Sequence, residues 1–234
     1  MRSIVTFAMA AGLLAAACPA SAANLVINGD FEAGNTGFTS DYAYSPGGGY
    51  APGVYTVDTS PSAWQSYFAP IGDHTTGSGN MMMINGAEST SQYVWSSGAI
   101  AVSAGADYFF EAFVASLYPQ SPPSLTFMYA LDGAAPAVLA TLDHTLELGV
   151  WEGMSTTFNT GSATSVQLFL RNAQGAYSGN DFALDDVYLG TTSIVNPGPI
   201  GAVPEPSTWA LMLLGFGAIG AVARRRQRTS FSYA

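Results

Sequence analysis

Residues 124–131 read SLTFMYAL, in which a large apolar side chain recurs at every second position. Successive side chains of a β-strand point to opposite faces of the sheet, so this period is typical of a strand with one buried face. Residues 166–171, VQLFLR, repeat the pattern, and residues 108–115, YFFEAFVA, form a more continuous apolar run that suits a central strand. The sequence therefore predicts an all-β fold.

Turn signals separate these segments. Asp132-Gly133 directly follows the first of them, and 26 glycines and 13 prolines punctuate the chain. No stretch of the central region has a convincing helical period, and we find no internal repeat. Many short strands with frequent turns predict a β-sandwich or jelly roll.

The first 22 residues predict a secretion signal with a short apolar helix. Arg2 supplies the positive start, residues 4–17 form an apolar run too short to span a bilayer comfortably, and Ala-Ser-Ala at 20–22 is a small-x-small cleavage site. The mature chain would then begin at Ala23. A buried N-terminal helix is the alternative, but Pro19 and the small residues around it disfavour that interpretation.

Cys18 is the only cysteine of the chain. A lipoprotein anchor on Cys18 is a second alternative, although Ala15 stands where such anchors usually have Leu. If the signal is removed after Ala22, the mature protein has no cysteine and no disulfide, despite export to an oxidising compartment.

The end of the chain carries another targeting pattern. Residues 191–203 contain Asn196-Pro197-Gly198-Pro199 and predict a linker, because the prolines remove backbone donors and the glycine loosens the chain. The motif Pro204, Glu205, Pro206 and Trp209 comes next, followed by an apolar stretch to position 223 and an Arg-rich cluster at 224–228.

An apolar run of about 15 residues is shorter than the roughly 20 that cross a bilayer unaided. The Arg cluster can snorkel, however, and Trp209 can lie at the opposite interface, so we expect a short transmembrane helix with its Arg end in the cytoplasm.

This order of motif, apolar helix and basic cluster at residues 204–228 resembles the PEP-CTERM sorting signals of Gram-negative bacteria, in their Pro-Glu-Pro-x-x-Trp-Ala form. The resemblance implies processing by an exosortase, a membrane transpeptidase that cleaves near the motif. It also implies transient anchoring in the inner membrane, a final location outside the cell or at its surface, and a link with exopolysaccharide production. An ordinary membrane anchor is the alternative.

The charge of the central region is strongly acidic. Between Ala23 and Val203 there are 15 acidic residues and one basic residue, Arg171, and the chain has no lysine. Such a region would repel nucleic acid and anionic lipid, and it suits divalent cations, cationic surfaces or simple solubility.

Two segments at opposite ends of the central region stand out. They read NLVINGDFE at 24–32 and NDFALDDVYL at 180–189, and the segment DHTTGSGN at 73–80 lies between them. Together they resemble a galactose-binding-like jelly roll, the fold of many carbohydrate-binding modules. The resemblance implies one domain over residues 23–190, with its first and last strands side by side.

In that fold a structural Ca²⁺ commonly lies near these two strands, and calcium prefers six to eight oxygen ligands. The resemblance implies a site made by Glu32, Asp73, the Thr76 carbonyl and Asp185, with Asp30 and Asp186 in reserve. An uncompensated carboxylate at position 185, between core residues, would be costly, and a cation would remove that cost. The alternative is that these acids are turn formers and solvated strand ends.

Aromatic residues are the candidate sugar contacts, because exposed flat rings stack on sugar faces. Tyr42, Tyr44 and Tyr50 flank the loop SPGGG at 45–49, which could present their rings. Most aromatic residues of a sandwich lie in its core, and we expect this of Trp95 and Trp151.

Catalytic signatures are scarce. His74 and His144 belong to no metal-binding motif, and the chain has no Gly-x-Ser-x-Gly elbow. A pair of carboxylates that cleaves a glycoside is the remaining catalytic possibility.

The sequence thus favours a non-enzymatic, exported β-sandwich that binds or organises extracellular polysaccharide, with calcium as a structural ion. One alternative is a structural or adhesive surface protein without a sugar site, and another is a glycosidase-like enzyme.

Overall fold

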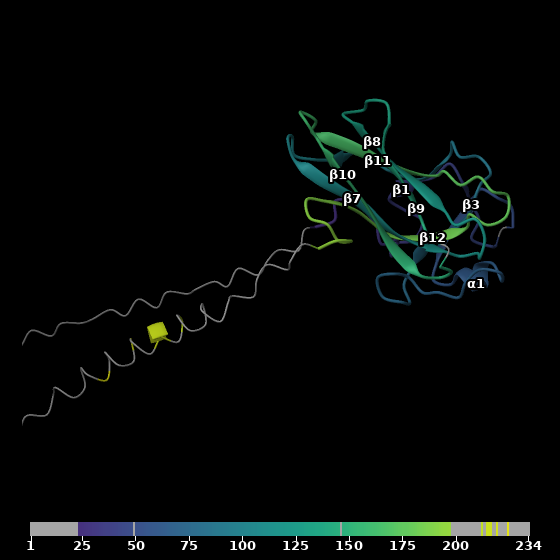
Figure 1. Ribbon diagram of the computed structural model, residues 1–234, viewed down its shortest axis with the longest axis horizontal. Helices are drawn as coiled ribbons and strands as arrows, with labels where there is room; N and C mark the ends of the chain where they lie inside the picture. The colour runs from purple at the N-terminus through teal and green to yellow at the C-terminus, as the bar shows by residue number, and fades with distance from the viewer. Residues whose placement is uncertain are drawn as a thin grey trace, which may run out of the picture. The chain divides into compact units, whose positions relative to one another are not determined.

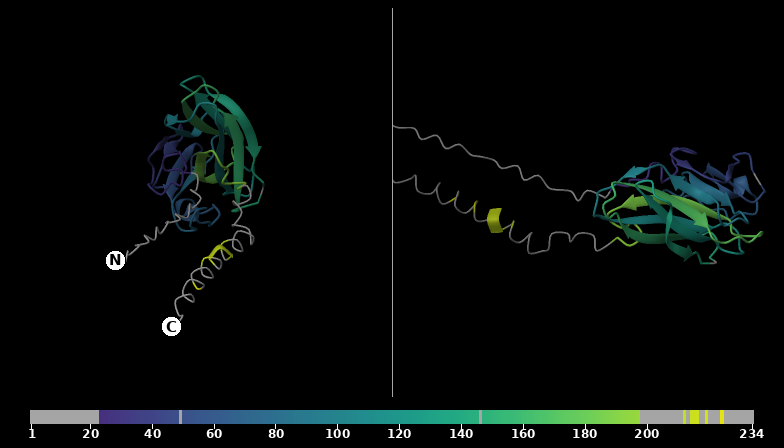
Figure 2. Two further views of the ribbon diagram at one scale, coloured as in Figure 1. Left: turned by 90° about the vertical axis from the view of Figure 1, so that its left-hand side faces the viewer. Right: turned by 90° about the horizontal axis from the view of Figure 1, so that it is seen from above.

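The computed structural model describes residues 23–48, 50–145 and 147–197, together with residues 212, 214–216, 219 and 224. The chain divides into two units, one formed by Ala22–Gly198 and the other by Met1–Ser21 with Pro199–Ala234. The first unit consists of strands and one short helix (Figures 1 and 2), which confirms the predicted all-β fold.

One sheet of this unit, here called sheet A, contains six strands. Their order is β1 (Phe38–Thr39), β5 (Tyr93–Ser97), β11 (Ser165–Asn172), β8 (Ser124–Leu131) and β9 (Ala137–Asp143), and β6 (Ile100–Ala101) also pairs with β11. All pairs are antiparallel. The alternating segments 124–131 and 166–171 therefore form neighbouring strands, as the period-two pattern predicts.

The other sheet, sheet B, also contains six strands. Their order is β10 (Trp151–Asn159), β7 (Asp107–Ser116), β12 (Phe182–Gly190), β4 (Met81–Asn85), β3 (Val54–Asp58) and β2 (Ala43–Tyr44). Only β2 and β3 run parallel. The apolar run at 108–115 forms β7, which lies between β10 and β12 as a central strand.

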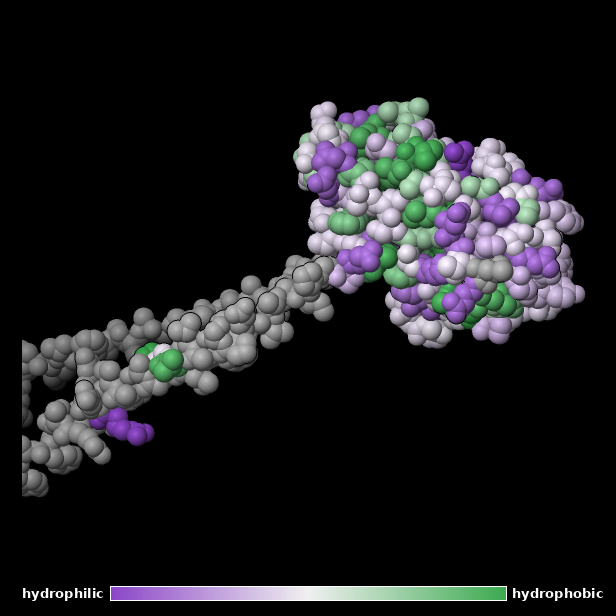
Figure 3. Space-filling model, viewed as in Figure 1, coloured by the Kyte–Doolittle hydropathy of each residue, from purple (hydrophilic) through white to green (hydrophobic). Residues whose placement is uncertain are grey.

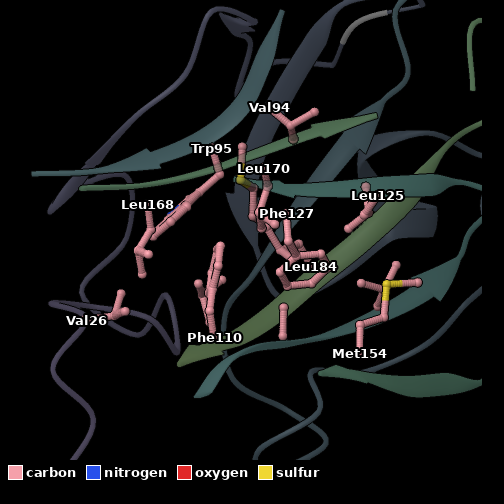
Figure 4. Packing of buried hydrophobic residues seen from close by; sticks show 14 of the residues in the cluster. Val26, Val94, Trp95, Phe110, Leu125, Phe127, Met154, Leu168, Leu170 and Leu184 are labelled. Carbon is pink, nitrogen blue, oxygen red and sulfur yellow. The ribbon is translucent and has the colours of Figure 1, made fainter. Parts of the chain in front are cut away.

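The main core lies between the two sheets. Trp95, Leu168 and Leu170 from sheet A meet Phe110 and Leu184 from sheet B (Figure 4). In β8, Leu125 and Phe127 are fully buried in this core, whereas Met128 and Ala130 pack with Phe169 in a separate small cluster. The two faces of the strand therefore have the different environments that the sequence pattern indicates.

A second apolar cluster covers the outer face of sheet B. Helix α1 (Pro61–Trp64) begins at the cap Ser60, whose hydroxyl accepts the Ala63 N–H, and its Trp64 packs with Phe68 on this face. The triplet Met81–Met83 serves both clusters, with Met82 in the main core and its two neighbours in the outer cluster.

The N-terminal segment lies beside the last strand, as expected, but it is not itself a strand. The Leu25 N–H donates to the Leu189 carbonyl at 2.9 Å, and the Val187 N–H donates to Gly29 at 2.8 Å. Positive φ angles of 53° at Asn28 and 55° at Phe31 break the extended conformation. The expected first strand at 24–32 is therefore a run of turns that pairs with β12 at separate points.

A short segment after β12, residues 191–196, packs back onto sheet B, and we call it the strap. Glu111 in β7 is fully buried and accepts hydrogen bonds from the Ser193 hydroxyl at 2.5 Å and from the Ile194 N–H at 2.6 Å. Val195 lies over Gly153, and a Cβ added at Gly153 would be 2.8 Å from Val195 Cγ1. The linker predicted to begin at 191 thus has its first residues bound to the sandwich.

Of the second unit, residues 212, 214–216, 219 and 224 are helical. No helix that the described residues form has the length and apolarity to cross a membrane. The predicted signal at 1–22 and the sorting residues Pro204, Glu205, Pro206 and Trp209 lie outside the described part of the chain.

Candidate functional site

Asp185 is the most buried of the predicted metal ligands. It lies in β12, on the opposite face from Leu184, and is fully shielded from solvent. Its carboxyl accepts the backbone N–H groups of His74 and Asp186, both at 2.8 Å. Burial, together with the negative charges of Asp186 and Asp73, raises the pKa of Asp185 to about 8.

Asp73 is also buried, and hydrogen bonds keep it ionised. It accepts the Thr76 N–H at 2.7 Å, the Thr76 hydroxyl at 3.0 Å and the Gly79 N–H at 2.6 Å. Burial alone would raise the pKa of Asp73, but these hydrogen bonds outweigh it and lower the pKa. Thr76, predicted to offer its carbonyl, contacts Asp73 through its N–H and hydroxyl.

Glu32 reaches the same loop from the N-terminal segment. Its Oε1 accepts the Asn80 N–H at 2.9 Å. A Cβ on Gly79 would lie 2.0 Å from Glu32 Oε1 and 3.2 Å from Asp73 Oδ2, so the glycine leaves room for both carboxylates. The structure thus brings Glu32 and Asp73 together and places Asp185 next to His74, the residue that follows Asp73.

The described residues contain no ready-made cluster of three or more His, Cys, Asp or Glu side chains that could hold a metal ion. Asp186 and Asp30, the two further candidate ligands, lie in other environments. Asp186 pairs with His74 Nδ1 at 2.6 Å and accepts the Thr75 hydroxyl at 2.9 Å. Asp30 lines a cavity of about 330 Å³ between the N-terminal segment and the strap, together with Asp186 and Tyr188.

His74 has a position that sequence reasoning did not predict. Its ring stacks on Phe113 with 3.6 Å between the ring centres and meets Trp151 edge-on at 5.9 Å. The imidazole therefore joins the acidic loop to the outer face of sheet B. Its adjacency to Asp73 was the one available signal in the sequence.

The three tyrosines predicted to present rings have different environments. Tyr42 is a core residue, 4% exposed, and its hydroxyl accepts the Ala87 N–H, so it cannot offer a free face. Tyr44 is partly exposed and packs against Tyr55 with ring centres 5.4 Å apart. Tyr50 is 72% exposed, as the loop prediction requires.

Two further tyrosines are as exposed as Tyr50. Tyr67 follows helix α1 and is 73% exposed, and Tyr177 lies in the loop before β12 and is 76% exposed. The sequence contained a usable signal for Tyr177, which stands among small and polar residues in GAYSG. Tyr67, in QSYFA, is next to the buried Phe68, so its exposure could not be read from its neighbours.

The loops that carry these rings are joined to one another by hydrogen bonds. The Ala69 N–H donates to Leu117, and the Leu117 N–H donates to Asp181, which links the Tyr67 loop to the Tyr177 loop. The Tyr50 loop is connected through the Gly53 N–H, which donates to Asn85, and Gly86 in turn donates to the Asp181 carboxylate. We call the three loops that carry Tyr50, Tyr67 and Tyr177 the tyrosine loops.

The tyrosine loops lie at the opposite end of the sandwich from the chain ends. β12 begins next to Asp181 and ends at Gly190, beside the N-terminal segment. At about 3.3 Å per residue its nine residues span roughly 25–30 Å. On the face shown in Figure 3, apolar side chains are distributed in separate patches among hydrophilic ones.

The C-terminal tail matches a known family. Residues 202–227 match the PEP-CTERM protein-sorting motif, which confirms the sorting signal predicted from Pro204 onward. No curated protein matches the chain.

Several solved structures are similar to the sandwich. The C-terminal domain of EclA, a sugar-binding protein, has 18% identity and a TM-score of 0.35, over 42% of this chain and 66% of that domain, just under two thirds. The CBM22-1 xylan-binding domain of Paenibacillus barcinonensis Xyn10C has 13% identity and a TM-score of 0.43, over 69% and 90%. TmCBM61, solved with β-1,4-galactotriose, has 12% identity and a TM-score of 0.42, over 72% and 99%.

Proposed function

We propose that the sandwich binds an extracellular polysaccharide through the tyrosine loops and does so without catalysis. The observation that carries this proposal is the exposure of three tyrosine rings, between 72% and 76%, on loops joined at one end of the domain. A tyrosine ring offers a flat apolar face and a polar hydroxyl, and it loses little conformational freedom on binding. These properties suit the faces and hydroxyl groups of sugars.

The sorting tail supports an extracellular place of action. We infer that the chain is exported, held briefly in the inner membrane, and processed by an exosortase near Pro204-Glu205-Pro206 before it reaches the cell surface or matrix. A mature product that lacks the tail, detected by mass spectrometry in the extracellular fraction, is the expected result. Recovery of the full tail there would contradict processing.

The burial of Asp181 and Asp185, the two carboxyls with a raised pKa, supports a function without catalysis. Burial raises the pKa of Asp181 to about 7 and contributes most to raising the pKa of Asp185 to about 8. Both side chains accept backbone N–H groups in buried positions, and neither lines the cavity described above. An acid catalyst has to reach its substrate, so these carboxyls are poor candidates for a glycosidase pair.

The polysaccharide proposal can be tested by electrophoresis in native gels that contain a polysaccharide, with the host's own exopolysaccharide as one of the probes. We expect the protein to be retarded, and the double variant Tyr67→Ala/Tyr177→Ala to migrate freely. Ile27→Ala is the matched control, because Ile27 is 75% exposed but lies at the other end of the sandwich. Equal retardation of the double variant would exclude the tyrosine loops as the binding site.

We further propose that Ca²⁺ binds near Glu32, Asp73 and Asp185. Hard carboxylate oxygens suit calcium, Gly79 leaves space between two of the carboxylates, and the one basic residue of the domain, Arg171, lies in sheet A. A cation would offset the mutual repulsion that contributes to the raised pKa of Asp185.

Thermal melts with CaCl₂ and with EDTA test the calcium site. We expect a higher melting temperature with calcium, and no such difference in Asp185→Asn, which keeps the size of the side chain but removes the charge. Identical melts of the unmodified protein in both conditions would show that the site does not bind calcium.

A structural or adhesive protein without a sugar site is the second candidate, and the acidic surface favours it. The region 23–203 has 15 acidic residues and one basic residue, which alone can keep an extracellular protein soluble. Failure of every polysaccharide to retard the protein would favour this candidate.

A further inference from the structure

Arg171 is the only basic residue of the sandwich, and it lies on the outer face of sheet A. In β11 it stands opposite Tyr93 of β5, and its guanidinium carbon is 5.8 Å from the centre of the Tyr93 ring. The Tyr93 ring in turn meets Phe169 with 4.7 Å between the ring centres. The contact with the Tyr93 ring restricts the orientation of the guanidinium before any ligand arrives.

The guanidinium of Arg171 has no hydrogen-bond or ion-pair partner among the described residues. No carboxylate oxygen of that part of the chain lies within 4.0 Å of its nitrogens, and its Nε is buried without an acceptor. A buried donor without an acceptor destabilises a fold. The region has 15 acidic residues, so we would expect an arginine with a purely structural role to be paired with one of their carboxylates.

Polar groups extend the same row across the sheet. Arg171 stands opposite Thr126, and Thr126 stands opposite Thr141, with a 2.9 Å hydrogen bond between the two threonine hydroxyls. Thr126 is buried, so the groups that this row presents to solvent belong to the half-buried Tyr93 and Arg171 and to the exposed Thr141. These are complementary to the faces and hydroxyl oxygens of a sugar.

The charge of the domain decides which class of glycan can use this row. A polyuronate would place many negative charges against a domain with 15 acids and one base, and the repulsion would accumulate along the polymer. An uncharged polysaccharide meets no such repulsion, and its hydroxyl oxygens can accept from the guanidinium.

We propose that Tyr93 and Arg171 form a second contact for the polysaccharide, distinct from the tyrosine loops, and that the bound glycan is uncharged. This inference rests on the proposed function, since it assumes that the protein binds a glycan.

Native gels that contain xylan, β-1,4-galactan or alginate can test the inference with the purified full-length protein. We expect a neutral polymer to retard the protein and alginate not to. Arg171→Gln should weaken binding roughly tenfold, the worth of one or two hydrogen bonds. Its melting temperature should change little, because Arg171 makes no hydrogen bond to the rest of the described chain and the substitution removes only its contact with the Tyr93 ring. Arg171→Lys, which keeps the charge but not the fork, should bind with intermediate strength.

Three outcomes would overturn the inference. Arg171→Gln could bind as tightly as the unmodified protein, or it could lose binding together with a large fall in melting temperature, which indicates a structural role. Alginate could also retard the protein more than the neutral polymers do, which would assign the arginine to an acidic glycan. If no polymer, including the host's exopolysaccharide, retards the protein, the proposed function itself fails.

Discussion

Asp181, the residue before β12, has a buried carboxyl that accepts the Gly86 N–H at 2.9 Å. Burial raises its pKa to about 7. Between about pH 4 and pH 7 the folded protein therefore holds a proton that the unfolded chain has released. Over this range the contribution of Asp181 to the free energy of unfolding falls as pH rises.

We predict that Asp181→Asn makes the fall in stability between pH 4 and pH 7 less steep, while the part of the slope that comes from Asp185 remains. The amide cannot ionise, so the loss that the carboxyl causes at higher pH disappears. Urea unfolding at several pH values measures this, with the exposed Asp58→Asn as the control. An unchanged slope in Asp181→Asn would mean that Asp181 does not titrate in this range.

Gly29 is required by a close backbone approach. A Cβ at this position would lie 2.0 Å from the Val187 carbonyl oxygen, and backbone cannot move aside as a flexible side chain can. We predict that Gly29→Ala lowers the free energy of unfolding by about 2 kcal/mol, because it separates the N-terminal segment from β12. Gly47→Ala, where a Cβ meets nothing within 4 Å, should change it by less than about 0.5 kcal/mol. Equal effects in urea titrations would contradict this explanation.

Individual residues of the candidate site were only partly predictable. The exposure of Tyr50 followed from its glycine-rich loop, whereas Tyr42 is buried in the core, as most aromatic residues of a sandwich are. In the fold its hydroxyl accepts the N–H of Ala87, 45 residues away, and no local pattern encodes this contact. The predicted calcium ligands remain a prediction, although the structure places Glu32 and Asp73 around one glycine.

At the scale of elements, the strap depends on one carboxylate. Glu111 accepts four hydrogen bonds, from the hydroxyls of Ser155 and Ser193 and the N–H groups of Ile194 and Val195. A buried carboxylate is costly unless it is fully hydrogen-bonded, so the strap and Glu111 stabilise each other.

We predict that Glu111→Gln lowers the free energy of unfolding by about 2–3 kcal/mol and exposes residues 191–196 to proteases. The amide NH₂ would face N–H donors, and charged hydrogen bonds of this kind contribute about 1.5–3 kcal/mol each. Chemical denaturation and mass mapping of proteolytic cuts measure both effects, with the exposed Glu147→Gln as the control. An uncut strap in the Gln variant would show that other contacts hold it.

Strands with a regular period were predictable, and segments held by distant partners were not. The alternation in 124–131 and 166–171 identified β8 and β11, because each strand has one face in the main core. The segment 24–32 was expected as a strand, but left-handed residues at 28 and 31 make it a series of turns. The strap contains no apolar period that could have predicted its position, because hydrogen bonds to the buried Glu111 hold it in place.

The whole molecule has an electrostatic imbalance with a measurable effect. The ion pairs among the described residues involve only histidines, and the acidic residues of the domain repel one another. We predict that raising NaCl from low to physiological concentration increases the melting temperature, because salt screens this repulsion. Protein stabilised by surface ion pairs would respond in the opposite direction, and a fall in melting temperature with NaCl would contradict our account.

The fold class and the sorting signal were predictable because their signals are local in sequence. The tail needs only a motif, an apolar run and a basic cluster in order, and residues 202–227 match the corresponding family. The tyrosine loops needed the structure, because hydrogen bonds across more than 60 residues join Leu117 to Asp181.

The separation of the chain ends from the tyrosine loops has a consequence for crowded surfaces. Any copy that is fixed by its C-terminus is held through the strap, whose Ile194 lies beside the N-terminal segment, so its rings remain free at the other end of the sandwich. Many copies fixed in this way could engage one long polymer at many points. Each contact could then be weak and short-lived, while the array as a whole retained the polymer through a high effective concentration of sites.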